Sequence, residues 1–407
     1  MKNYRRKIGI ALGLLSLAVM VSMSYAGSTH VAKTSRTEVP EPDAVLAQPS
    51  IQETDNTTVS STKIHLALIL DTSNSMDGLI DQAKAQLWNI VGELAKAKYD
   101  TSNVDIEIAL YEYGNDGLSL SSNYIRQVLP FSTDLDVLSE KLFSLRTNGG
   151  SEYCGAVIHE ALNALPWPQT DSSLNIIYIA GNEPFDQGGI SYREACAEAK
   201  MKHVAVNSIY CGNYNEGTTS GWSNGASLAG GLYFNIDSDQ KTVFVSTPFD
   251  DQINQLNVDL NNTYIYYGKQ GASSKENQVR QDKNSETYST ANTAKRAISK
   301  SSKMYKNDHW DLVDAYEKDK TVVKTVDKST LPPDLKNKSD VEIEVAVRTK
   351  TDERTKIRIE ITELANKREE YLVNQSDSTN QNNENTLGDK IIVSVRQQAK
   401  TKGYVFE

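Results

Sequence analysis

The chain contains little cysteine: its 407 residues include only Cys154, Cys196 and Cys211. Three cysteines exclude a disulfide-dense scaffold, and they lack the paired spacing of a zinc site. In an exported protein they allow one disulfide and leave one thiol over. The sequence leaves open whether Cys196 and Cys211 pair, since a helix followed by a returning strand would bring them to the same level.

The chain also lacks a dominant basic block and carries a formal net charge of −10, which argues against nucleic acid as a partner. Its single long apolar run, Ile8–Met23, follows a positively charged start and precedes Ser24-Tyr25-Ala26. That order is typical of a signal peptide, predicted here as residues 1–26, with a retained membrane anchor as the alternative. Because no second run of this length exists, we expect a soluble mature protein that meets the membrane only through this peptide or an envelope partner.

Residues 27–62 are rich in Ser, Thr, Pro, Glu and Gln, which predicts a flexible tether. From 63 to 264, apolar strand-like runs alternate with amphipathic helical patterns. The alternation predicts an α/β domain with a doubly wound, mainly parallel sheet and helices on both faces. Residues 265–407 predict a smaller, mostly helical C-terminal region.

Several segments of the C-terminal region stay ambiguous in the sequence. Residues 270–308 fit either helix or a partly ordered linker. A helix is expected from about Asp352, whereas the alternating apolar residues of 341–347 leave strand or helix open. The charges of this segment fit a solvated helical face; the alternative is a module that packs on itself or on another envelope protein. A last helix is expected to end at Gly403.

One stretch carries the strongest chemical signal. An apolar run ends in Asp71-Thr72-Ser73-Asn74-Ser75, which places one carboxylate and two hydroxyls within five positions. These hard oxygen donors suit Mg²⁺, Mn²⁺ or Ca²⁺ rather than zinc or copper. Open α/β sheets bind ligands at the carboxyl ends of their strands, where this loop would lie. The alternative is a polar turn that caps the next helix.

Two further polar loops are expected at the same edge of the sheet. The glycine-rich loop 147–152 precedes a helix, and the loop 181–183 follows another apolar strand. A loop that only caps a helix would not require two further polar loops beside it. The convergence of three such loops therefore favours a ligand-binding site.

Residues 63–262 resemble a von Willebrand factor A (VWA) domain. Asp71-x-Ser73-x-Ser75 resembles the metal-ion-dependent adhesion site of that family, and Gly149-Gly150-Ser151 resembles its Gly-Gly-Thr, with Ser in place of Thr. The stretches 152–155 and 180–185 are similar to those of a group of exported bacterial proteins. The chain departs from the family at Gly181, where the family carries an Asp.

The resemblance implies how such a site would work. Ser73 and Ser75 would bind Mg²⁺ directly, Asp71 directly or through water, and Ser151 according to the state of its loop. Asn182 or Glu183 would replace the missing Asp, or the site would have one carboxylate fewer. A carboxylate from a partner protein would complete the shell.

Other candidates in the sequence are weaker. His159-Glu160 begins a zinc-protease pattern, but Asn163 stands where the second His is required. Cys154 is expected to be a packing thiol rather than a nucleophile, because no His has a readable pairing with it. Trp222 fits an exposed binding residue as well as a core residue.

We therefore expect an exported bacterial protein of the periplasm or cell surface that binds a divalent cation, mediates adhesion or another protein–protein interaction, and catalyses nothing. The first alternative is a metal-assisted hydrolase with Glu152 or Glu183 as general base. The second is a structural envelope protein whose ion site is inactive because of Gly181.

Overall fold

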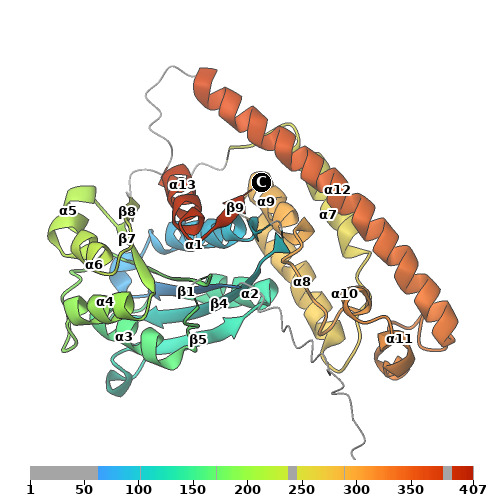
Figure 1. Ribbon diagram of the computed structural model, residues 1–407, viewed down its shortest axis with the longest axis horizontal. Coiled ribbons are helices and arrows are strands. Elements are labelled where there is room, and N and C mark those ends of the chain that lie inside the picture. Colours follow the sequence, from blue (N-terminus) through green and yellow to red (C-terminus); the bar gives the residue numbers. More distant parts are fainter. Residues whose placement is uncertain are drawn as a thin grey trace, which may run out of the picture. The chain divides into compact units, whose positions relative to one another are not determined.

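The computed structural model describes residues 63–100, 102–170, 172–236, 245–287, 289–378 and 387–406 (Figure 1). The predicted signal peptide, 1–26, and tether, 27–62, lie outside the described residues. All the described residues belong to one compact unit. Among them, no helix is both long and apolar enough to cross a membrane.

The predicted fold class is confirmed: a mainly parallel six-stranded sheet forms the centre of the α/β region. Its strand order is β5-β4-β1-β6-β7-β8, and only β5, at one edge, runs antiparallel to its neighbour. The strands are β1 Lys63–Asp71, β4 Asp105–Tyr113, β5 Ile125–Ser132, β6 Leu174–Gly181, β7 Ala205–Cys211 and β8 Tyr233–Ile236. Pro130 lies in β5, as expected of an edge strand.

The central strand β1 has apolar side chains on both faces of the sheet, so both faces are covered by helices. Leu66, Leu68 and Leu70 belong to the apolar core on one face, whereas Ala67 and Ile69 belong to the core on the other. β1 pairs with β4 on one side and with β6 on the other, so the strand order reverses beside it. Sheets of this kind bind ligands at such a reversal, and the carboxyl end of β1 is Asp71.

Helices cover both faces of the sheet (Figure 1). The first core includes residues of α1 and α2, and the second includes residues of α3, α4 and α6. The bounds of these helices and of the short elements near them are α1 Ile80–Leu94, α2 Leu135–Ser144, α3 Cys154–Ala164, α4 Tyr192–Met201, α5 Tyr214–Thr219, α6 Trp222–Leu228, and the 3₁₀ turns Asn74–Met76 and Leu120–Ser122. Neither α5 nor α6 was expected from the sequence.

The three cysteines are free and buried. Cys196, on α4, lies in the core on one face of the sheet, and Cys211, at the end of β7, lies in the core on the opposite face. The sheet separates them, so the disulfide that the sequence left open is not formed.

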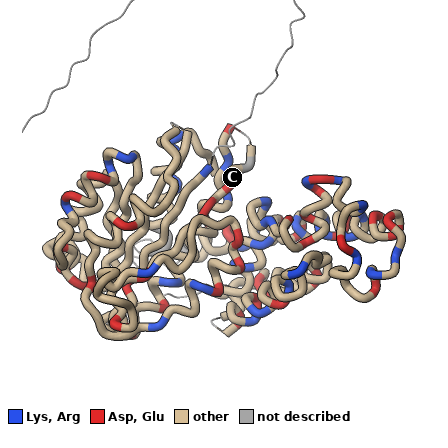
Figure 2. The backbone as a smooth tube through the Cα atoms, turned by 90° about the horizontal axis from the view of Figure 1, so that it is seen from below, with Lys and Arg blue, Asp and Glu red and all other residues tan. Residues whose placement is uncertain are grey.

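The C-terminal region is mostly helical, as predicted. Its elements are α7 Asp250–Asn261, α8 Gly271–Glu286, α9 Thr290–Ser301, α10 Leu312–Lys318, α11 Val322–Thr325, the 3₁₀ turn Lys328–Thr330, α12 Asp340–Ser378 and α13 Leu387–Lys400. Residues 270–308 thus hold two helices rather than a linker. Figure 2 shows both signs of charge interspersed along these helices.

Helix α12 begins twelve residues before the predicted Asp352. Ser339 and Glu342 form a capping box, in which the Glu342 carboxylate accepts a bond of 2.9 Å from the Ser339 backbone and the Ser339 hydroxyl accepts the Glu342 N–H. The apolar alternation at 341–347 is therefore part of a helix: Ile343 and Val347, four residues apart, are buried, while Val345 between them is exposed.

The chain returns to the sheet at its C-terminal end. Helix α13 packs beside α1 and β8, and Gln398 and Asn207 exchange two amide bonds of 2.7 and 2.8 Å. A strand that the sequence did not predict follows, β9 Tyr404–Phe406. It pairs with β2 Ala97–Tyr99, which also pairs with β3 Ser102–Asn103.

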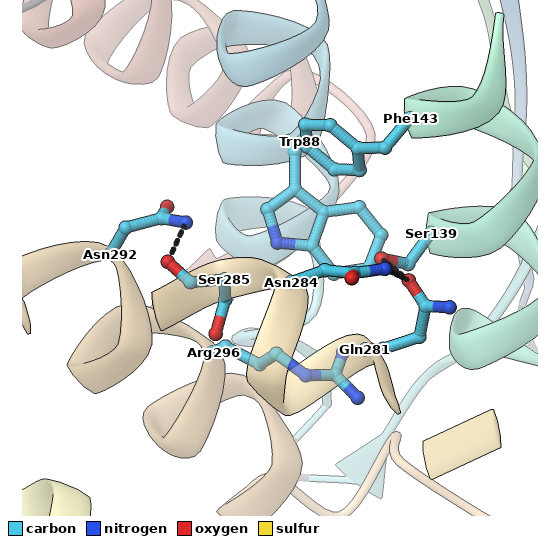
Figure 3. Close-up of a pocket in the computed structure, with 8 residues that line it drawn as sticks. All are labelled: Trp88, Ser139, Phe143, Gln281, Asn284, Ser285, Asn292 and Arg296. Atoms are coloured by element: carbon cyan, nitrogen blue, oxygen red, sulfur yellow. Dashed lines mark hydrogen bonds between the residues drawn. The ribbon is translucent and has the colours of Figure 1, made fainter. Parts of the chain in front are cut away.

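Buried charges join the sheet region to α8 and α9. Arg296 donates bonds of 2.6 Å to Asp136 of α2 and to Asp282 of α8. A cavity of about 20 Å³ lies beside Arg296, between α1, α2, α8 and α9 (Figure 3). One water molecule would fill such a volume, so this cavity is too small for a ligand.

Candidate functional site

Asp71 lies at the carboxyl end of β1 and is fully buried. Its Oδ1 accepts a hydrogen bond of 2.8 Å from the Ser73 backbone N–H. Within the described residues its buried Oδ2 accepts no hydrogen bond, although the Asn182 backbone N–H lies near enough to lower the pKa of the carboxyl. Burial raises the pKa of this carboxyl from 3.8 to about 7. A buried carboxylate oxygen without a partner is costly, unless a ligand outside the chain satisfies it.

The two predicted serines and Asn182 form a chain of oxygen atoms next to Asp71. The Ser73 and Ser75 hydroxyls are 2.8 Å apart, and the Ser75 hydroxyl donates to Asn182 Oδ1 at 2.8 Å. The Asn182 amide donates back to the Ser75 carbonyl at 2.8 Å, which fixes the orientation of its oxygen toward the serines. Met76, just after them, is buried under the loop.

The glycine-rich loop 147–152 joins the same edge. The Asn148 N–H donates to the Thr72 carbonyl at 3.0 Å, which ties this loop to the Asp71 loop. A side chain at Gly150 would overlap the Gly114 backbone, so this close approach requires glycine. Ser151 is half-buried, and no hydrogen bond of its hydroxyl is present within the described part of the chain.

Glu152 is the site residue that sequence reasoning did not place among the ligands. It is buried, with 7% of its surface exposed, and its carboxyl lies close enough to the Ser73 side chain for that side chain to lower its pKa. Burial raises the pKa of its carboxyl above the usual value, and nearby Glu183 raises that pKa further. A Cβ added to Gly114 would lie 2.8 Å from Asp71 Oδ1 and 3.1 Å from Glu152 Cγ. The two acids therefore approach each other over this glycine.

The site holds more acceptor oxygens than hydroxyl protons. Ser73 and Ser75 contribute two protons, whereas their side chains contact each other, Asn182 Oδ1, Glu152 and Asp71. Each hydroxyl donates only one bond. When both acids are ionised, some of these oxygen pairs share no proton, and a cation among them would relieve the repulsion.

Gly181, where the VWA resemblance would place an Asp, has no room for a side chain. A Cβ at this position would overlap the Tyr113 hydroxyl and lie 3.0 Å from both Asp71 Cβ and Trp222 Cη2. The space that an Asp would need is occupied by these two aromatic residues. A carboxylate on β6 is thus excluded by packing in this chain.

Trp222 is a core residue and not an exposed binding residue. It is fully buried, and its Nε1 donates to the Glu183 carbonyl at 2.8 Å. Its indole therefore holds the loop 181–183 in place. The Glu183 side chain is half-buried and interacts electrostatically with Glu152.

The weaker candidates take structural roles. The Cys154 thiol is buried and donates to the Tyr113 hydroxyl at 3.5 Å; burial raises its pKa well above the usual value, which disfavours a nucleophilic thiolate. His159 contacts Glu198 at 2.8 Å and Asn163 on the helix surface.

The donor set fits a hard cation. Within the described ranges, no group of three or more His, Cys, Asp or Glu side chains could hold a metal ion. The available donors are instead carboxylate, hydroxyl and amide oxygens, with the unpartnered Asp71 Oδ2 among them. Such oxygens suit Mg²⁺, Mn²⁺ or Ca²⁺ and leave room for water ligands.

No protein-family model and no curated protein sequence matches the chain. The solved structures that overlap part of it include the following three. BatB from Bacteroides thetaiotaomicron has 16% identity, a TM-score of 0.34, and coverage of 43% of this chain and 90% of that one. The VWA domain of SpRpn10 has 16% identity, a TM-score of 0.34, and coverage of 48% and 95%. The pilus adhesin SpaC of Lactobacillus rhamnosus GG has 12% identity, a TM-score of 0.31, and coverage of 44% and 28%. These TM-scores are too low to support an argument about the fold. We therefore assign the fold from the strand order and the helices of the chain itself.

Proposed function

We propose that the chain binds a divalent cation, Mg²⁺ or in its place Mn²⁺ or Ca²⁺, at the carboxyl end of β1. The observation that carries this proposal is the lack of positive partners for two adjacent buried acids. Of nine buried Asp and Glu residues in the described ranges, seven form ion pairs with Arg or Lys, and Asp71 and Glu152 do not. Buried acids need a counter-charge, and a cation would supply it.

The ligand assignment follows the positions of the oxygens. Ser73 and Ser75 would bind the cation through their hydroxyls, and Asp71 directly or through water. Asn182 would contribute its amide oxygen or orient Ser75, which it contacts at 2.8 Å. Ser151 would bind when its loop moves closer, and Glu183 would act through water. Waters would complete the shell.

We propose that the bound cation serves to hold a partner protein and not to drive a reaction. A carboxylate of the partner would displace one water, because Ser75 and the loop residues around it are exposed. The chain would act in this way after export, in the periplasm or at the cell surface of a bacterium. This assignment rests on the VWA resemblance of the loops and on the predicted signal peptide.

Calorimetric titration of the purified protein with Mn²⁺ and Mg²⁺ tests the cation site. We expect saturable binding in the wild type, its loss in Asp71→Asn, and unchanged binding in Asp81→Asn. Asp81 makes a good control because the substitution removes the same charge from a side chain that is 66% exposed on α1. An absence of binding in the wild type would contradict the proposal.

The partner is tested by capture from an envelope extract on immobilised protein with Mg²⁺ and with EDTA. We expect a protein retained with Mg²⁺, released by EDTA and not captured by Asp71→Asn. Mg²⁺-dependent turnover in a broad hydrolase screen that Glu152→Gln abolishes would instead favour the enzymatic alternative.

A further inference from the structure

Glu152 is the last residue of the glycine-rich loop 147–152 and precedes α3 by two residues. The Glu152 side chain is buried rather than exposed to solvent. It lies close to the Ser73 side chain, and a Cβ added to Gly114 would meet Asp71 Oδ1 at 2.8 Å and Glu152 Cγ at 3.1 Å. No Lys or Arg side chain in the described ranges pairs with it. Burial of an acid against another acid is unfavourable by itself, so this position calls for a separate reason.

Gly181 supplies that reason. The neighbouring strand β6 cannot offer a carboxylate, since Tyr113 and Trp222 fill the space next to its backbone. Without another acid, Asp71 would be the sole buried carboxylate at the site. A divalent cation would then retain one uncompensated charge in a partly buried place, which weakens its binding.

We propose that Glu152 is a direct ligand of the cation and supplies the second carboxylate of the site in place of an acid on β6. This inference rests on the proposed cation site. Asp71 and Glu152 together carry two negative charges, which neutralise one divalent ion. The unpartnered Asp71 Oδ2 beside them independently marks the place as one that lacks a ligand.

The assignment has a consequence for partner binding. A site with two carboxylates of its own loads the cation in the free protein, before any partner arrives. The partner's carboxylate then meets a neutral site and gains less from charge than it would at a site with a single acid. The order of binding is cation first, partner second.

Mn²⁺ titration followed by electron paramagnetic resonance and by water-proton relaxation tests the inference. We expect Glu152→Gln to weaken Mn²⁺ binding at least tenfold, because it removes a charge, and Glu152→Ala to add about one Mn²⁺-bound water, because it also removes the ligand oxygen and leaves a vacant position. Glu160→Gln is the matched control, since it removes the same charge from an exposed position on α3. It should change the affinity less than threefold.

The outcomes separate this inference from the proposed function. A wild type that does not bind Mn²⁺ overturns the cation site itself. A wild type that binds, with Glu152→Gln binding equally well, leaves the site standing and overturns the role of Glu152. Weaker binding in Glu152→Gln without an added water in Glu152→Ala also overturns direct ligation, because the acid then acts only through its charge. Circular dichroism of these variants checks that they remain folded.

Discussion

The buried acids of the helical region form ion pairs with Arg or Lys, whereas the two at the edge of the sheet form none within the described residues. In the helical region, Asp311 and Asp314 lie within 2.7 Å of the Arg354 guanidinium, and Lys300 contacts Asp282 at 2.6 Å. At the sheet edge, Asp71 and Glu152 approach each other without a positive side chain. The same chain thus neutralises the acids that hold its helices together, and leaves two unpaired where a ligand can reach them.

This difference distinguishes charged residues that stabilise the fold from charged residues that are available to bind a ligand. Arg354 also donates to the Thr263 hydroxyl and carbonyl at 2.9 Å, so its cluster is satisfied within the chain. Asp71 Oδ2 is unsatisfied, and a structure does not gain stability from such an atom. Residues that cost stability without a partner are candidates for binding.

The largest expected effect comes from breaking the internal pairing at Arg354. Arg354→Ala leaves buried Asp311 without its ion-pair partner and Asp314 with only Arg358 at 4.0 Å, which should lower the free energy of unfolding by about 3–5 kcal/mol. Urea denaturation measures this change. Lys350→Ala on the same helix is the control, because its ion pair with Glu353 is partly exposed and should be worth less than about 1 kcal/mol. Equal losses of stability in Arg354→Ala and Lys350→Ala would show that the buried ion pairs stabilise the fold no more than an exposed one does.

Asp71 should show the opposite behaviour. The pKa of this group is about 7 in the folded protein against 3.8 when exposed, so the folded state holds the proton better. The stability of the metal-free protein should therefore fall as the pH rises from about 4 to about 7, by up to about 4 kcal/mol. Asp71→Asn should be more stable than the wild type at pH 8 in EDTA and should lose most of this dependence.

The measurement is the urea midpoint between pH 4 and pH 8, with EDTA and with Mn²⁺. Mn²⁺ should restore the stability of the wild type at pH 8 and leave Asp71→Asn unchanged. A destabilised Asp71→Asn in EDTA would mean that the carboxylate has a structural partner after all, and the comparison between the two regions would fail.

How far the sequence predicts these features depends on the range of the contacts. The sheet was predictable because β1 is apolar on both faces and the helices have a clear period, and both signals are local. Asp71, Ser73 and Ser75 stand in one short motif, so they were identified as a group. The helix start at Asp340 also had a local signal, the Ser339–Glu342 capping box, which the strand-like alternation obscured.

The remaining features depend on residues far apart in the chain. Tyr113 on β4 and Trp222 on α6 leave no room for a side chain at position 181. The separation of Cys196 from Cys211 depends on which face each residue takes. The strand β9 exists because it meets β2, about 300 residues earlier in the chain. Single-sequence patterns do not carry such information.

The pH dependence of stability at Asp282 provides a test of the buried ion pairs. Lys300 and Arg296 lower the pKa of its carboxyl from 3.8 to about 2 against the opposing effect of burial. The folded state therefore binds this proton less well than the unfolded state, and the stability it gives is present above pH 4. That stability, about 2 kcal/mol, should be lost as the pH falls from about 4 to about 2.

Asp282→Asn should remove this acid-sensitive part, which is measured as the difference between wild-type and variant urea midpoints at pH 2.5 and pH 6. We expect the variant to be less stable at pH 6 and closer to the wild type at pH 2.5. A constant difference at both pH values would show that the ion pairs of α8 and α9 do not stabilise the fold.

The smallest expected effect concerns the amide pair that fastens α13 to the sheet. Gln398→Ala leaves the buried Asn207 amide without its partner, although Asn207 Oδ1 still accepts from the Leu232 N–H at 2.8 Å. We expect a loss of about 1–2 kcal/mol in the free energy of unfolding, against a loss below about 0.5 kcal/mol for the exposed neighbour Gln397→Ala. Mn²⁺ affinity should be unchanged in both variants, because this contact lies on β7 and away from Asp71. A Gln398→Ala protein that unfolds like the wild type but binds Mn²⁺ more weakly would instead connect the C-terminal helix to the cation site, and the division between paired structural groups and unpaired binding groups would no longer hold.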